Sequence, residues 1–200
     1  MAKIESTLRN MVISLIAVTA LTGALLATVY EITKAPIAAS ENNRLIDAIR
    51  QVAPSFDNLP LNDSCKIAVG VGDTLKVYPT RMDGKFTGAA IESYTRKGFS
   101  GVIRIMVGFN ADGAIRNYVV LHHAETPGLG AKMQQWFSDT TQAGRCIIGR
   151  NSSAPLRVKK DGGDIDAITA ATISSRAFLD AINRAALAFQ RIDKNPLHSK

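Results

Sequence analysis

Hydrophobic positions divide the chain into one unbroken apolar segment near its start and a longer region in which apolar and polar residues alternate. Residues 10–30, NMVISLIAVTALTGALLATVY, contain no charged side chain. In a helix that rises about 1.5 Å per residue, roughly 20 residues cross the hydrocarbon core of a bilayer. A signal peptide has an apolar core of only about 7–15 residues and a small-residue cleavage site, which is not evident here. We therefore predict one retained transmembrane helix over residues 10–30.

The charges on either side of this segment predict its orientation. Lys3 and Arg9 precede it, whereas Glu31 and Lys34 follow it. Basic residues are enriched on the cytoplasmic side of membrane spans, so we expect residues 1–9 in the cytoplasm. The rest of the chain then lies on the extracytoplasmic side of a single-pass protein.

A shorter helical pattern follows the apolar segment. After Pro36, the apolar residues Leu45, Ile49 and Val52 recur at helical spacing until a second proline ends the pattern. We expect a short amphipathic helix next to the membrane, within a juxtamembrane helix and linker that covers residues 31–60.

Residues 61–200 are predicted to form one α+β domain. Alternating and β-branched residues predict strands, and NADG at 110–113 predicts a hairpin turn. The predicted strands cover residues 66–71, 74–78, 88–94, 101–109 and 114–123. A short helical segment is expected over residues 134–137. A longer helix is expected from about Ser175 to Arg191, with an apolar face that contains Phe178, Ile182, Ala185, Ala186 and Phe189. Antiparallel strands with helices packed on one side define the α+β class.

Composition narrows the function classes. The chain has 24 Lys+Arg against 17 Asp+Glu. These basic residues are scattered rather than interleaved with aromatics, which argues against a nucleic-acid partner. Cys65 and Cys146 lie far apart and outside any CxxC pattern, so this chain alone offers no iron–sulfur or structural zinc site. In an exported domain the two thiols either pair or remain two separate buried groups.

Other short motifs offer little chemistry. VGVGDT and GLGAK lack the spacing of phosphate-binding loops and are interpreted as turns. His122, His123 and Glu125 do not form a zinc-binding H-E-x-x-H motif, so we expect no metal site. DGGDID at 161–166 lacks the sixth-position glycine of a calcium loop. No serine lies in a G-x-S-x-G setting, so a hydrolase is poorly supported.

The segment DAITAATISS, residues 166–175, concentrates hydroxyl groups immediately before the C-terminal helix. In the simplest interpretation Ser174 and Ser175 cap the helix. A helix N-terminus also presents unpaired N–H groups and the positive end of the helix dipole, which together stabilise a phosphate. The Thr172 hydroxyl could carry such a phosphate as an ester.

Several motifs together resemble the FMN-binding domain family. Residues 166–172, DAITAAT, are similar to its flavinylation motif D-x-x-(S/T)-G-A-T, with Ala170 in place of the glycine. Residues 123–130, HAETPGLG, resemble its H-x-E-T-P-G-L-G loop. The strand and turn GFSGVIRIMVGFNADG and the N-terminal span agree as well, so the resemblance covers nearly the whole chain. It implies that a flavin transferase takes FMN from FAD and links it through its phosphate to Thr172.

The resemblance also implies a set of flavin-binding residues. The loop is expected to close over the ribityl chain or isoalloxazine ring. Lys160, with Arg157 and Lys159, is a candidate for stabilising reduced flavin, or else these residues form a solvated basic edge. The implied cofactor-binding residues are Thr172, Thr169, Asp166, Glu125, Thr126, Gly128, Leu129, Gly130 and Lys160.

The function implied by the resemblance is a membrane-anchored electron carrier with covalent FMN. Such a chain is a subunit of an Rnf-type complex in the inner membrane of a bacterium, which couples electron transfer between ferredoxin and NAD⁺ to ion translocation. Its partners are the other membrane and iron–sulfur subunits, the flavin transferase and the lipid bilayer, and no complete reaction is expected from this chain alone. The alternatives are an anchored FMN-binding redox sensor or assembly scaffold, or the equivalent subunit of a Na⁺-translocating NADH:quinone reductase.

Overall fold

The computed structural model describes residues 7–70 and 72–192 and divides the chain into two compact units, one ending at Leu45 and the other beginning at Ile46. Most of the predicted cytoplasmic segment 1–9 lies outside the described residues. From Leu8 onward the first unit is a single helix. The second contains a sheet, the other helices and the candidate site, and the two units are described separately.

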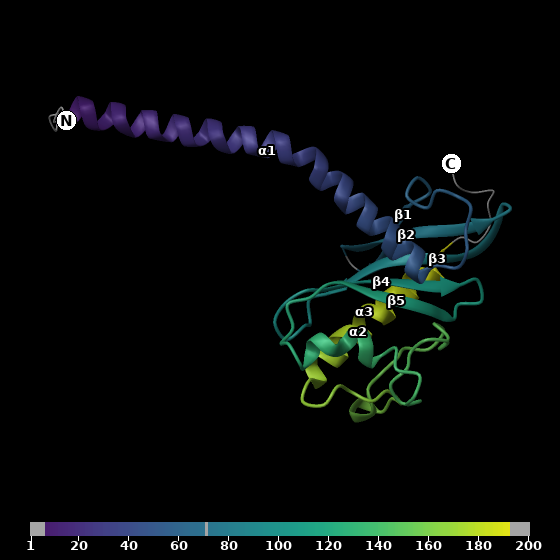
Figure 1. Ribbon diagram of the computed structural model, residues 1–200. Coiled ribbons are helices and arrows are strands. Elements are labelled where there is room, and N and C mark those ends of the chain that lie inside the picture. Colours follow the sequence, from purple (N-terminus) through teal and green to yellow (C-terminus); the bar gives the residue numbers. More distant parts are fainter. Residues whose placement is uncertain (1–6, 71, 193–200) are drawn as a thin grey trace. The chain divides into compact units, whose positions relative to one another are not determined.

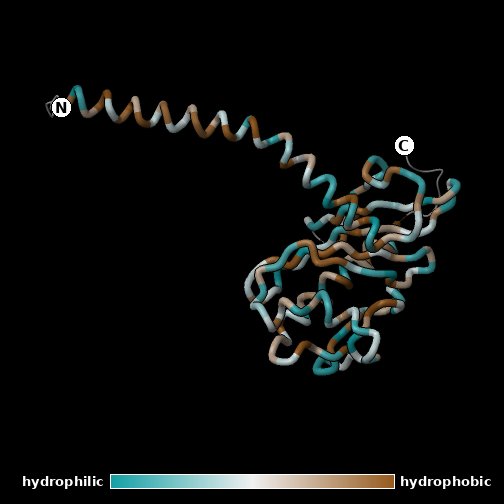
Figure 2. The backbone as a smooth tube through the Cα atoms, viewed as in Figure 1, coloured by the Kyte–Doolittle hydropathy of each residue, from teal (hydrophilic) through white to brown (hydrophobic). Residues whose placement is uncertain are grey.

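The first unit is the greater part of α1, Leu8–Val52, which is long and apolar enough to cross a membrane. Much of this helix is coloured as hydrophobic along its backbone in Figure 2. Its large apolar side chains, such as Leu15, Leu21 and Leu25, are exposed over more than half of their surface. Its threonines donate their hydroxyl protons to carbonyls one turn back, for example Thr22 to the Val18 oxygen at 2.8 Å. The hydroxyls of these threonines are thereby satisfied without water. The predicted single apolar helix is confirmed.

The helix is not interrupted at Pro36, contrary to the expectation of a separate juxtamembrane helix. Proline removes one backbone hydrogen bond, yet α1 continues through Pro36 to Val52. The amphipathic segment around Ile49 and Val52 is therefore the end of the same helix. These last turns belong to the second unit, where both side chains are buried.

Five strands form an antiparallel sheet, as predicted, and they follow one another in it in sequence order (Figure 1). The strands are β1 (Cys65–Gly70), β2 (Asp73–Met82), β3 (Lys85–Thr95), β4 (Ile103–Asn110) and β5 (Ile115–His122). In β4, Ile103, Ile105, Val107 and Phe109 are buried on one face, as expected for alternating positions. The sheet confirms the predicted α+β class.

Part of the other face of β4 is also buried, which alternation did not predict. Met106 is fully buried, and a Cβ built on Gly108 would lie 1.9 Å from the Val52 carbonyl oxygen. The end of α1 thus packs closely against this strand, and only glycine fits at the point of closest approach.

The long helix α3, Thr172–Gln190, covers the first face of the sheet, which includes Phe109 (Figure 1). The Phe109 and Phe189 rings stack with centroids 4.9 Å apart, and Phe178 stacks on Phe137 at 4.6 Å. Phe137 follows the short helix α2, Met133–Trp136. Cys65 and Cys146 are both free, so the described residues contain no disulfide.

Candidate functional site

A cavity of about 320 Å³ opens at the N-terminus of α3. Three segments form its walls: the loop between β3 and β4, the loop after β5, and the turn that leads into α3 together with the first residues of that helix. The lining residues are Phe99, Thr126, Leu129, Gly130, Ala170, Ala171, Thr172, Ile173 and Ser174. The structure therefore places Thr172 beside part of the motif loop over residues 123–130.

The first turn of α3 presents free hydrogen-bond donors to this cavity. The first amide of the helix to reach a carbonyl belongs to Ser175, which donates to the Ala171 oxygen at 3.0 Å. Within the described part of the chain, no acceptor pairs with the backbone N–H groups of Thr172, Ile173 and Ser174, or with the half-buried Thr172 hydroxyl. Three unpaired N–H groups at the positive end of a 19-residue helix favour an anion.

The expected capping role of Ser174 and Ser175 is wrong, because α3 begins at Thr172 and its cap residue is Ala171, which makes no side-chain bond. The Ser174 hydroxyl donates instead to Glu125 Oε2. The Ser175 hydroxyl accepts from the Ile168 N–H at 2.9 Å and donates to the Ala171 carbonyl at 2.9 Å. Both serine hydroxyls therefore hold the start of the helix to neighbouring segments, whereas the Thr172 hydroxyl makes no such bond with the described residues.

Ala170 adopts a left-handed conformation, with φ of 59°. The corresponding position of the resembled motif is glycine, which adopts this conformation without a steric penalty. An L-residue in this region is strained by about 1–2 kcal/mol. The turn before Thr172 therefore has the left-handed conformation that glycine favours, although this chain carries alanine at position 170.

We predict that Ala170→Gly stabilises the protein by about 0.5–1 kcal/mol, because the relief of strain exceeds the greater freedom of glycine in the unfolded chain. Urea unfolding measures the change. Ala171→Gly is the matched control: its φ is −132°, so glycine there gives no relief and should destabilise. Equal destabilisation by both substitutions would contradict strain at Ala170.

The loop after β5 contributes one buried charged side chain. Glu125 is 4% exposed and accepts a hydrogen bond from the Ser100 N–H at 3.1 Å as well as from Ser174. The turn that follows contains Gly128 at φ 77°, and Gly130 is buried against Ser174. The loop residues Thr126 and Leu129 remain exposed at the cavity.

Three residues of the implied set lie away from the cavity lining. Asp166 pairs with Lys159 Nζ at 2.7 Å, and its carbonyl accepts from Trp136 Nε1 at 2.8 Å. Lys160 and Thr169 are exposed, and neither lines the cavity. The contacts of Asp166 are therefore with Lys159 and Trp136 rather than with the cavity.

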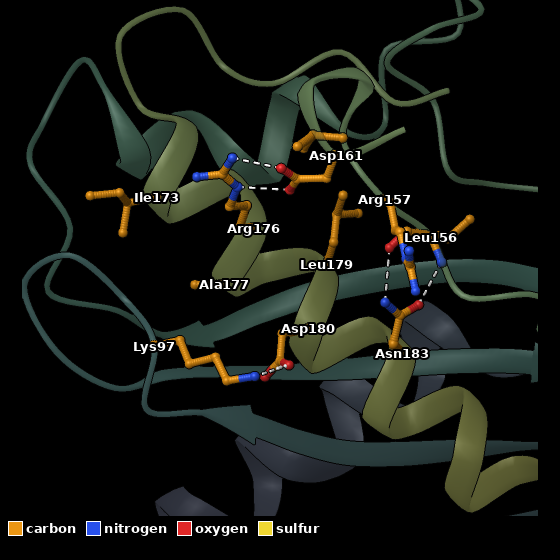
Figure 3. A pocket seen from close by; sticks show the side chains of 11 residues that line it. Lys97, Leu156, Arg157, Asp161, Ile173, Arg176, Ala177, Leu179, Asp180 and Asn183 are labelled. Carbon is orange, nitrogen blue, oxygen red and sulfur yellow. Dashed lines mark hydrogen bonds and ion pairs between the residues drawn. The ribbon is translucent and has the colours of Figure 1, made fainter. Parts of the chain in front are cut away.

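A second cleft of about 530 Å³ lies along α3 (Figure 3). Ile173 lines both this cleft and the cavity at Thr172. Arg176 binds Asp161 through two hydrogen bonds of 2.7 and 2.6 Å, which hold the pKa of that carboxyl below its ordinary value. Lys97 pairs with Asp180 at 2.7 Å. Arg157, a candidate from the sequence, lines this second cleft rather than the cavity at Thr172.

Sequence reasoning missed Phe99 and Ile173 at the cavity, and Arg176 in the neighbouring cleft. Phe99 is 67% exposed and Ile173 is 51% exposed, so neither serves the core. Spacing gives a signal for Arg176, because residues four apart on a helix lie side by side. Phe99 comes to the same cavity as Thr172 only when the sheet folds, because it lies in the loop between β3 and β4.

The site region matches proteins of known class. Residues 98–187 match the family described as FMN-binding domain, a range that contains every residue of the cavity. The chain is 38% identical over 172 residues to the G subunit of the ion-translocating oxidoreductase complex of Salmonella typhi, with 82% of each chain covered. It is 37% identical over 175 residues to the protein of the same name in Escherichia coli K12, with 84% of each covered. For Photorhabdus laumondii, the identity is 34% over 198 residues, with 94% of this chain and 93% of the relative covered.

Proposed function

Because the chain belongs to the family of G subunits of the ion-translocating oxidoreductase complex, with its FMN-binding domain, we propose that it carries FMN on Thr172 as an electron-transfer subunit of such a complex. The observation that carries the attachment site is the Thr172 hydroxyl, which is unpartnered within the described residues. It lies beside three free N–H groups at the mouth of a cavity. The motifs in the sequence predicted this family, and the comparisons confirm it.

The residues at this site fit FMN. The N–H groups of Thr172, Ile173 and Ser174 suit a phosphate, since an anion at a helix N-terminus is stabilised by donors and dipole together. Phe99, Leu129 and Ile173 add exposed apolar surface for an aromatic ring. The cavity volume of about 320 Å³ lies within the range of ligand pockets, roughly 300–1,000 Å³.

Attachment is proposed as a phosphoester formed with FAD as the donor. The Thr172 oxygen forms a bond to the phosphorus on the riboflavin side of the pyrophosphate, and the bond from that phosphorus to AMP breaks. AMP leaves, and the threonine proton passes to solvent or to a base of the flavin transferase. The backbone N–H groups of α3 then hold the phosphate, and no residue of this chain needs to be a nucleophile other than Thr172.

When bound, FMN supplies reversible one- and two-electron redox chemistry, while the protein sets its position and electrostatic surroundings. We propose that the chain relays electrons within an Rnf-type complex that couples ferredoxin and NAD⁺ to ion movement. Its partners are then membrane and iron–sulfur subunits, and a flavin transferase matures it. Lys160, Thr169 and Asp166 are proposed to shape the surroundings of the motif rather than to line the cavity.

The domain is proposed to lie outside the cytoplasm. One apolar helix, α1, supports a single-pass anchor. The charges at Lys3 and Arg9 favour a cytoplasmic N-terminus in the inner membrane of a bacterium. Residues 10–30 then span the bilayer, and the FMN-binding domain follows on the periplasmic side.

Purification from native membranes in mild detergent tests the place of the chain in a complex. We expect co-purification with polytopic and iron–sulfur subunits. The separated chain should reduce and reoxidise its flavin with small-molecule redox agents but show no turnover with NADH alone. Purification without redox partners would favour a sensor or scaffold, and robust NADH oxidation by the separated chain would contradict a relay role.

A further inference from the structure

We propose that Glu125 is a positioning residue that fixes the first turn of α3, and with it the Thr172 hydroxyl, against the two loops that wall the cavity. This inference rests on the proposed attachment of FMN at Thr172. It assigns Glu125 a role through its neighbours rather than through contact with the flavin.

The Glu125 side chain joins three segments that are distant in sequence. Its Oε1 accepts from the Ser100 N–H in the loop between β3 and β4, at 3.1 Å. Its Oε2 accepts from the Ser174 hydroxyl in the first turn of α3. Glu125 itself lies in the loop after β5. One carboxylate therefore ties together all three segments that line the cavity.

Burial of this carboxylate would destabilise the folded protein if its hydrogen bonds were lost. Glu125 is 4% exposed, and no basic side chain pairs with it in the described part of the chain. A buried carboxylate without a cation is stabilised only by the hydrogen bonds it accepts. The two donors are thus held firmly, and Ser174 cannot move without leaving the charge unsatisfied.

Two glycines let the segments approach closely enough for these bonds. A Cβ on Gly130 would lie 2.4 Å from Ser174 Oγ and 2.9 Å from Glu125 Oε2. A Cβ on Gly98 would lie 2.8 Å from Glu125 Oε1. These distances are shorter than real Cβ contacts. A methyl group at Gly130 would displace Ser174 or the carboxylate, and one at Gly98 would displace the carboxylate and the Gly101 carbonyl oxygen, which is nearer at 2.1 Å. The backbone at Gly98 and the backbone at Gly130 thus each lie close to one oxygen of the Glu125 carboxylate.

Glu125 acts behind the cavity wall. Gly130 and Ser174 line the cavity, whereas Glu125 does not. Ser174 follows Thr172 by two residues in the same helical turn, so its anchor sets the direction of the free N–H groups and of the Thr172 hydroxyl. Misplacement of a reacting group by about 1 Å can slow a reaction by roughly a hundredfold. Loss of this anchor should therefore slow the transfer of FMN to Thr172.

The test measures the rate of covalent FMN incorporation into the full-length chain, produced in membranes and incubated with FAD, Mg²⁺ and a flavin transferase. Glu125→Ala should incorporate FMN at least about tenfold more slowly than the wild type. Glu125→Gln should stay within about threefold, because its amide can accept from Ser100 and donate to Ser174. Ser174→Ala removes the anchor from the helix side and should be slow as well.

Ser93→Ala is the matched control. The Ser93 hydroxyl is fully buried and donates to the Ala181 carbonyl at 2.7 Å, so it also ties α3 to the sheet, but far from the first turn of the helix. Rates are compared at a temperature at which thermal unfolding shows all variants to be folded. Ser93→Ala should incorporate FMN at the wild-type rate.

Three results would overturn the positioning role. The first is wild-type incorporation in Glu125→Ala or in Ser174→Ala. The second is an equal slowing in Ser93→Ala, which would indicate general destabilisation. The third is a loss in Glu125→Gln as large as in Glu125→Ala, which would indicate a role for the charge. Failure of the proposed attachment is separate: it appears as a wild-type chain without covalent FMN or as a labelled Thr172→Ala chain.

Discussion

Thr172→Ala is expected to abolish covalent FMN while leaving the fold intact. The substitution removes the only proposed nucleophile, so in-gel flavin fluorescence of the denatured chain should fall to background. The Thr172 hydroxyl makes no hydrogen bond with the described residues. The free energy of unfolding should therefore change by less than about 0.5 kcal/mol.

Two further variants make this result specific. Thr169→Ala removes an exposed hydroxyl of the same motif and should retain the wild-type fluorescence. Thr172→Ser keeps a hydroxyl at the same position and should remain a substrate of the transferase. Fluorescence that survives in Thr172→Ala would move the attachment away from Thr172.

Phe178→Ala is expected to have the largest effect on stability. Phe178 is fully buried, stacks on Phe137 at 4.6 Å and meets the Tyr118 ring edge at 5.0 Å. Removal of a buried phenylalanine costs about 3–5 kcal/mol. That is a large share of a typical stability of about 5–15 kcal/mol, so urea unfolding should shift to much lower concentration. The fluorescence of Trp136, the single tryptophan, reports the transition.

Ile173→Ala is the control for this prediction. Ile173 lies on the same helix, but its side chain is 51% exposed. Its loss should change the free energy of unfolding by only about 0.5 kcal/mol. A similar loss of stability in both variants would contradict the packing assigned to Phe178.

Patterns that depend on local geometry could be predicted from the sequence. The alternation of Ile103, Ile105, Val107 and Phe109 predicted β4, and the order of the segments predicted an antiparallel sheet. Helical spacing from Phe178 to Phe189 predicted most of α3. These patterns hold because side chains alternate in a strand and return to one face of a helix at fixed intervals.

Features that depend on tertiary contacts could not be predicted. The burial of Met106 and Gly108 requires the end of α1 to pack on the sheet. Ser174 resembles a helix cap in sequence, but its hydroxyl is taken by Glu125, 49 residues earlier. This contact leaves the first N–H groups of α3 without a capping side chain.

The candidate site was predictable in part. Thr172 and the loop residues Thr126, Leu129 and Gly130 share one cavity, although they are more than forty residues apart in the chain. Their nearness was implied by the resemblance and not by spacing. Lys160 was proposed as a flavin partner from its position just before the motif, but it does not line the cavity, since sequence proximity does not determine the direction of an exposed side chain.

The most direct measurement is mass spectrometry of the tryptic peptide that contains the motif, prepared from the native membrane protein. Cleavage after Lys160 and Arg176 releases residues 161–176, DGGDIDAITAATISSR, which contain Thr169, Thr172 and two serines. An FMN phosphoester that fragmentation localises to Thr172 is the predicted result. The unmodified peptide alone, or FMN on another hydroxyl, would contradict attachment at Thr172.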